Sequence, residues 1–192
     1  MRRQRNLLGP QAMGGMVSLW GASSLIKSIQ RGTIVIAAAS ASNTATIAAV
    51  ATENTVVRWL GISYDTDGAV DERSAWAYLS LTNATTVTAT RGATTGAATV
   101  SYEVTEFLPG VIRSVQRGTI FMSAAASNTA TITSVDTAKS MAYYNGTQSG
   151  DGFGYSSRYL IRVVLTNATT VTATRGNATN NMTMAYQVTE FF

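Results

Sequence analysis

The sequence contains neither cysteine nor histidine among its 192 residues. Without cysteine there is no disulfide and no thiolate nucleophile, and without histidine there is no Ser-His-Asp triad and no ordinary zinc site. Charged residues make up only 12% of the chain, and no run of about 18 apolar residues could cross a membrane as a helix. We therefore expect a protein that is not an enzyme, uses no cofactor or metal, and has no membrane partner.

Leucine is also scarce, with 10 residues against 29 threonines and 28 alanines. Threonine is enriched in strands because its branched Cβ packs well on a pleated surface. Hydrophobic residues account for 45% of the chain, which excludes a disordered, highly charged polypeptide. The composition therefore predicts a folded protein built from β-strands.

The positive charge is concentrated at the N-terminus. Three of the four net charges come from Arg2, Arg3 and Arg5, and the rest of the chain carries 11 basic and 10 acidic residues. A nucleic-acid surface needs basic residues clustered on a folded face, and the remaining arginines are scattered along the sequence. We expect no nucleic-acid partner.

Residues 1–25 have the basic start of a secretory signal, but Gly9-Pro10 and Gly14-Gly15 interrupt the apolar core that a signal peptide requires. We interpret this segment as an extended docking arm rather than a signal peptide; a frayed terminus is the alternative. The residues expected to dock on partners are Arg2, Arg3, Arg5, Leu7, Leu8, Met13, Met16, Leu19 and Trp20.

An internal duplication organises the rest of the chain. Four motifs recur in the same order, at a spacing that falls from 86 to 84 residues: IKSIQRGTI/IRSVQRGTI (26–34 and 112–120), SNTATI (42–47 and 127–132), LTNATTVTATRG (81–92 and 165–176) and VTEF (104–107 and 188–191). This predicts two tandem domains, 26–107 and 111–192, joined by the linker 108–110. Because three residues span only about 10 Å, the domains must be adjacent.

Each copy has the period-two alternation of half-buried strands, clearest in 86–90 and 182–188. Six or seven short strands per copy indicate a small antiparallel β-sandwich, with a small barrel as the alternative. We expect turns at Ser42-Asn43, Asp67-Gly68, Arg91-Gly92, Asn145-Gly146 and Arg175-Gly176. Domains this small and this rich in Ala and Thr bury little apolar area, which favours a homo-oligomer, either a trimer with pseudo-sixfold symmetry or a higher ring.

Charged residues that recur in both copies are expected to serve the fold. We expect Arg31 or Arg91 to pair with Glu106, and the equivalent residues to pair in the second copy; solvated surface charges are the alternative. The recurring set is Arg31, Arg91, Glu106, Arg117, Arg175 and Glu190.

Candidate chemistry is sparse. The acidic segment 65–72 could hold calcium through carboxylates, but it lacks the spacing of an EF-hand loop, and a plain loop is the favoured interpretation. A carboxylate pair for glycoside hydrolysis could be drawn from Asp71, Glu72, Glu103 and Glu106, although nothing sets their separation. Trp59 and Trp76 could form a platform for stacking a sugar, or could belong to the core.

The recurring motif string resembles small proteins encoded among the structural genes of tailed bacteriophages. The resemblance covers residues 26–192 and implies a virion component, assembled in the host cytoplasm, whose partners are other virion structural proteins. It carries no catalytic residues over to this chain. Capsid decoration and tail or baseplate attachment are both compatible with it, and a carbohydrate-binding or receptor-binding module of a phage tail is the alternative.

Overall fold

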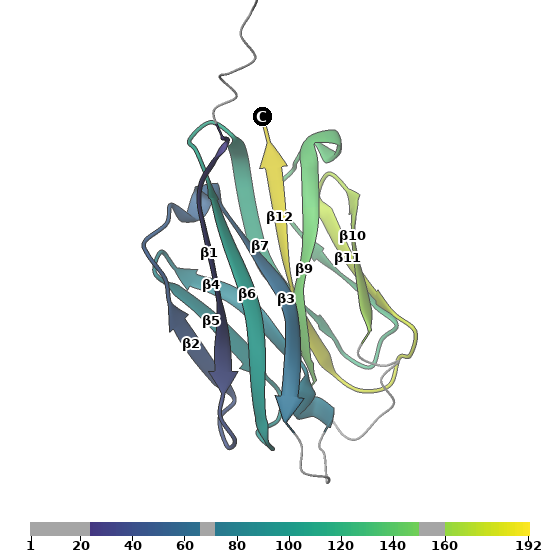
Figure 1. The fold of residues 1–192 in the computed structure, drawn as a ribbon. Helices are drawn as coiled ribbons and strands as arrows, with labels where there is room; N and C mark the ends of the chain where they lie inside the picture. Colours follow the sequence, from purple (N-terminus) through teal and green to yellow (C-terminus); the bar gives the residue numbers. More distant parts are fainter. Residues whose placement is uncertain (1–23, 66–71, 150–159) are drawn as a thin grey trace, which may run out of the picture.

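A computed structural model describes residues 24–65, 72–149 and 160–192, and these parts of the chain are almost entirely β-strands (Figure 1). The elements up to residue 107 are β1 (Ile26–Ile36), β2 (Ser42–Thr46), η1 (Thr52–Asn54), β3 (Thr55–Asp65), η2 (Glu72–Ala75), β4 (Ala77–Asn83), β5 (Thr86–Arg91) and β6 (Ala97–Phe107). The elements after residue 107 are β7 (Ile112–Met122), β8 (Ser127–Thr131), η3 (Thr137–Lys139), β9 (Ser140–Ser149), β10 (Ile161–Asn167), β11 (Thr170–Arg175) and β12 (Met182–Phe191). The predicted all-β class is confirmed.

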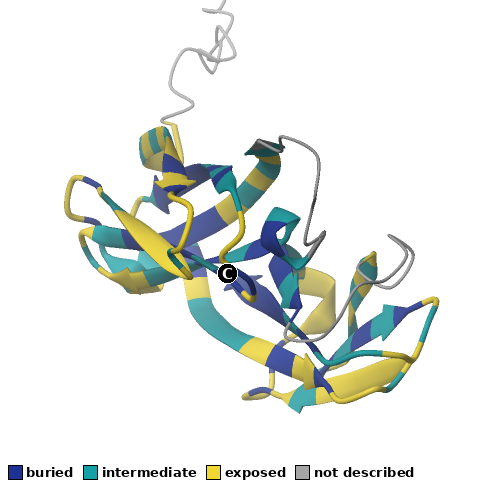
Figure 2. Cartoon of the chain, turned by 90° about the horizontal axis from the view of Figure 1, so that it is seen from below, coloured by how far each residue is buried: buried dark blue, intermediate teal, exposed yellow. Residues whose placement is uncertain are grey.

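The strands pair into antiparallel sheets that occur twice along the chain. In residues 26–107 the strand orders are β1-β6-β3 and β2-β5-β4, and in residues 112–191 they are β7-β12-β9 and β8-β11-β10. Each pair of sheets encloses its own apolar cluster, one around Ile34, Val57 and Val100 and the other around Ile120 and Met184. Figure 2 shows the two halves side by side, each with stretches of strand coloured as buried. The arrangement is sandwich-like.

Equivalent residues of the two halves pair in the same register. Arg31 lies opposite Glu103 in the β1–β6 pair, and Arg117 lies opposite Gln187 in the β7–β12 pair. Each of these pairs also has a register shift near its end, next to Phe107 or to Phe191. The second half therefore repeats the strand pairing of the first, while the division into domains at 26–107 and 111–192 stays a prediction.

The two halves contact each other directly. Tyr78 of β4 pairs with Gly146 of β9, which joins β2-β5-β4 to β9-β12-β7 in one six-stranded sheet. The contact also changes the burial of β12. The alternation predicted one buried face, and Met184 and Val188 are buried as expected. Gln187 and Thr189 on the opposite face are buried as well, because strand β3 of the first half lies over them.

Two of the predicted turns are wrong. Ser42 and Asn43 begin β2, and the Asn43 amide donates a hydrogen bond of 2.7 Å to the Val35 carbonyl. Asn145 and Gly146 lie inside β9, where Gly146 has φ +93° beside a register shift in the β9–β12 pair. Asn-Gly is a common hairpin turn, but the positive φ of glycine serves equally well at a bulge. The Asp67-Gly68 turn lies outside the described residues.

Candidate functional site

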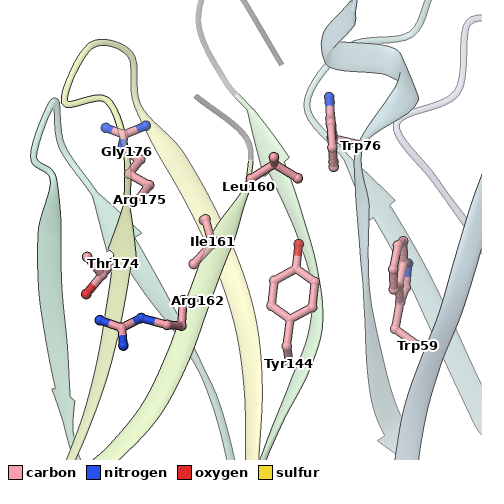
Figure 3. Close-up of a pocket in the computed structure, with 9 residues that line it drawn as sticks. All are labelled: Trp59, Trp76, Tyr144, Leu160, Ile161, Arg162, Thr174, Arg175 and Gly176. Carbon is pink, nitrogen blue, oxygen red and sulfur yellow. The ribbon is translucent and has the colours of Figure 1, made fainter. Parts of the chain in front are cut away.

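A cleft of about 540 Å³ lies between the two halves. The first half contributes Trp59 from β3 and Trp76, which lies between η2 and β4. The second half contributes the remaining lining residues: Tyr144, Leu160, Ile161, Arg162, Thr174, Arg175 and Gly176. Figure 3 shows the two tryptophans on one side, Tyr144 and Leu160 nearest to them, and the guanidinium groups of Arg162 and Arg175 on the far side. The cleft therefore has an aromatic wall, an aliphatic wall and two guanidinium groups.

Two of the three aromatic residues of the cleft are repeat equivalents of each other. Trp59 and Tyr144 occupy equivalent positions in the two copies, and their ring centroids lie 5.9 Å apart at 75°, an edge-to-face contact. Burial raises the pKa of the Tyr144 hydroxyl. The Nε1 of Trp59 is buried and has no hydrogen-bond partner among the described residues.

The sequence singled out Trp59 and Trp76 as possible glycan contacts, and the structure brings both to the same cleft. Trp59 is also half-buried and packs against the core cluster of the first half, so the alternative that it belongs to the core fits this residue too. The second half's contribution was missed. Leu160 is the repeat equivalent of Trp76, and the loss of the aromatic ring in the second copy was the only sequence signal for this position.

The predicted pairing of Arg31 or Arg91 with Glu106 is wrong. Arg31 Nε donates to Glu103 at 2.6 Å, and Arg58 forms a second ion pair with the same carboxylate. The hydrogen bond from Arg58 is the main cause that lowers the pKa of Glu103, and burial opposes it. Arg31 faces Glu103 because the two are direct cross-strand neighbours, whereas Glu106 lies three residues further along β6.

Glu106 instead holds a loop in place. It accepts a hydrogen bond of 2.9 Å from the backbone N–H of Ala51 and pairs with Lys27 Nζ at 2.9 Å. Burial of Glu106 acts to raise its pKa, but these two donors outweigh it, and the pKa of Glu106 is lowered. Glu190 repeats the arrangement, with the N–H of Asp136 at 2.9 Å and Arg113 Nη1 at 3.5 Å. The recurring glutamates thus bind the loop before each short 3-10 helix.

Arg91 and Arg175 bind backbone carbonyls instead of carboxylates. Arg91 is buried and donates to the carbonyls of Ser40, Ala37 and Gly96 at 2.9–3.0 Å. Arg175 is also buried and donates to Ala125 and Asn180. Desolvation lowers the pKa of both guanidinium groups. The expectation that these recurring charges serve the fold fits the contacts, although Arg175 also lines the cleft.

Arg117 makes a contact that the sequence did not reveal. Its Nε donates to Gln187 Oε1 at 3.0 Å, and its Nη2 donates to the carbonyls of Thr52 and Thr55 in the first half. Gln187 also accepts from the backbone N–H of Val57, at 3.3 Å. Desolvation lowers the pKa of Arg117 to about 10. The one sequence signal for this contact is that Glu103 of the first copy is replaced by Gln187 in the second. A neutral side chain is suited to a position that is buried against the backbone of the other half.

Several predicted sites lie outside the described residues. These are the docking arm (Arg2, Arg3, Arg5, Leu7, Leu8, Met13, Met16, Leu19 and Trp20) and most of the acidic segment 65–72. Within the described ranges, no three acidic side chains come together as a metal site, and Glu103 and Glu106 point to different faces of β6. No helix in the described part of the chain is long and apolar enough to cross a membrane.

Comparisons with known proteins found no relative of this chain. No protein-family model, no curated protein and no solved structure matches the chain.

Proposed function

We propose that this chain is a non-enzymatic structural protein of a tailed-bacteriophage virion, an oligomeric accessory component of the capsid or of the tail and baseplate. The phage assignment rests on the motif string of the two copies. The structural role is supported by how the recurring charged residues are used. Glu106, Glu190 and Arg91 each bind backbone groups of loops, so their charge stabilises the framework.

The observation that carries the proposal is the set of contacts between the halves. The side chains of Arg117 and Gln187 form hydrogen bonds with backbone groups of the neighbouring repeat. A protein whose duplicated modules bind each other in this way is suited to assembly. Residues 1–25 would add contacts to other virion proteins, as their mixture of arginine and large apolar side chains suggests.

The test is to follow an epitope-tagged copy through infection with the phage that encodes it. Purified particles are banded in a density gradient, heads and tails are separated, and each fraction is probed for the tag. We expect the protein to band with particles at a fixed copy number and to remain with one of the two fractions. Protein found only at the top of the gradient would disprove the virion assignment.

A second function is favoured by one specific observation, the meeting of Trp59 and Trp76 in a single cleft. A sugar ring could stack on either indole, while Arg162 binds its hydroxyls. A glycan array probed with the wild type and with Trp76→Ala tests this function. Val35→Ala, a change on an exposed strand position outside the cleft, is the control. Binding that persists in Trp76→Ala, or no binding at all, would exclude this function.

A further inference from the structure

The contact between the halves has two unlike sides. We call it the inner junction. The first half contributes the outward edge of β3, where the Thr55 carbonyl and the Val57 N–H meet Arg117 and Gln187. The second half contributes the outer face of β7-β12-β9, with Gly146 at the crossing with β4. Because the sides differ, each half keeps one side of the junction unused.

The unused sides are the repeat equivalents of the used ones. On the second half, the outward edge of β9 is paired with β4 only at Gly146, and its earlier stretch carries the Ser140 carbonyl and the Ala142 N–H at the positions of Thr55 and Val57. The register is the same in both halves, so these groups face away from β12 as their equivalents face away from β6. On the first half, the outer face of β1-β6-β3 carries Arg31, at the position of Arg117.

Burial differs between the two sets in a consistent direction. Asn145, which lines the groove of the inner junction, is 3% exposed, whereas its equivalent Leu60 is 53% exposed. Val56, between the two junction residues of β3, is 3% exposed, whereas its equivalent Met141 is 54% exposed. The unused surfaces therefore present large apolar side chains at the positions that the inner junction covers.

The polar groups also match. Arg31 reaches Glu103 through Nε, as Arg117 reaches Gln187 through Nε. The Nη2 of Arg117 is the group that crosses to the other half, so Arg31 is placed to offer the same donor. Glu103 in turn can accept from a backbone N–H, as Gln187 does. The Ser140 carbonyl and the Ala142 N–H supply the complementary groups.

The glycine at the crossing of β4 and β9 is closely covered, whereas its repeat equivalent is open. A Cβ on Gly146 would lie 2.3 Å from the Ala77 carbonyl oxygen of β4. The equivalent Gly61 has φ +131°, and a Cβ there would meet nothing within 4 Å. Strand β10, the equivalent of β4, is an edge strand in the described part of the chain. The space beside Gly61 is therefore open to a β10 strand from outside the chain.

We propose that a second copy of this chain binds there, head to tail. The β9 edge and strand β10 of one copy dock on the outer face of β1-β6-β3 of the next copy, which reproduces the inner junction between chains. The proposal rests on the homo-oligomer included in the proposed function, and it names the two surfaces involved. Such a heterologous contact closes into a ring when the rotation between neighbours divides a full turn, and otherwise extends as a filament.

The test uses one glutamate substitution on each unused surface. Leu60→Glu alters the β1-β6-β3 face and Met141→Glu alters the β9 edge; both residues are exposed, so the fold should tolerate the change. A carboxylate buried without a partner should weaken the contact by roughly a hundredfold or more. The control is Val35→Glu, because Val35 is 52% exposed and its equivalent Phe121 remains exposed beside the inner junction.

The mass of each protein in solution is measured by sedimentation at matched concentration. We expect an oligomer for the wild type and for Val35→Glu, and monomers for Leu60→Glu and Met141→Glu. An equimolar mixture of the two monomeric variants should form dimers and nothing larger, because only one intact surface of each kind remains per pair. Circular dichroism checks that each variant is folded.

Three results would overturn the proposal. The first is a monomeric wild type, and the second is that the two variants remain oligomeric. The third is that the two variants form no dimer when mixed, which would indicate a contact between identical surfaces. A fourth comparison removes residues 2–25: if the truncated chain loses its oligomeric state, the arm is the occupant and the proposal is wrong. A monomer that still bands with virions would refute this inference and the oligomeric state but leave the virion assignment standing, whereas an oligomer that never bands with them would refute the virion assignment.

Discussion

Arg117 of the second repeat donates a hydrogen bond of 2.5 Å from Nη2 to the backbone carbonyl of Thr55 in the first repeat. In the first repeat the equivalent arginine, Arg31, binds Glu103 and has an exposed side chain. The same residue at the same strand position therefore joins the two halves in one copy and lies at the surface in the other. This difference leads to the first prediction.

Arg117→Ala should destabilise the protein by about 2 kcal/mol, because the buried Thr55 carbonyl and Gln187 lose a charged donor. Arg31→Ala is the matched control and should cost less than about 1 kcal/mol, because its side chain is 62% exposed and Arg58 still pairs with Glu103. Urea unfolding at constant, low protein concentration measures both. Equal losses would show that the contact between the halves adds nothing to stability.

Gly146→Ala should lower the free energy of unfolding more than Gly61→Ala does. Both glycines have positive φ, so alanine strains the backbone at either site by about 1–3 kcal/mol. Only at Gly146 does the added Cβ also collide with the Ala77 carbonyl, which should cost a further 1–3 kcal/mol or so. The difference between the two unfolding free energies measures the closeness of β4 and β9, and a difference near zero would contradict the crossing.

Stability should fall on acidification, partly because of Glu103 and Glu106. Their pKa values are lowered in the folded protein, so the unfolded chain binds protons first as the pH falls. Their contribution is fully present above the unfolded pKa of about 4.3 and is lost as the pH drops through the folded values. Glu103→Gln should therefore flatten the dependence of unfolding free energy on pH below about 4.5. An unchanged slope would mean that Glu103 is not ion-paired.

Removal of residues 2–25 should leave the remaining chain folded and abolish its incorporation into particles. The strands begin at Ile26, and both apolar clusters are built from later residues, so the truncated protein should keep the circular dichroism spectrum of the body. Co-sedimentation with virions measures incorporation. Full occupancy of the truncated protein in particles would disprove the docking role of the arm.

The pattern of the sequence predicted the strands because strand periodicity is local. The alternation in 86–90 puts Val87 and Ala89 inside, and both are fully buried. The duplication predicted which segments are equivalent, and β1 and β7 pair with β6 and β12 in the same register. Asn145-Gly146 lies within a strand instead of a turn, because the dipeptide allows a bulge as readily as a hairpin and β4 pairs with β9 at this point.

Residue types and their spacing along the chain are enough to predict the all-β class and the equivalence of the two copies. Which charges meet and where the tryptophans lie depend on how the folded strands pack. Arg31 faces Glu103 because of the β1–β6 register, and Trp59 meets Tyr144 because the halves are in contact. Those relationships depend on sheet order and on how two modules dock, which join residues far apart in sequence and leave no local pattern.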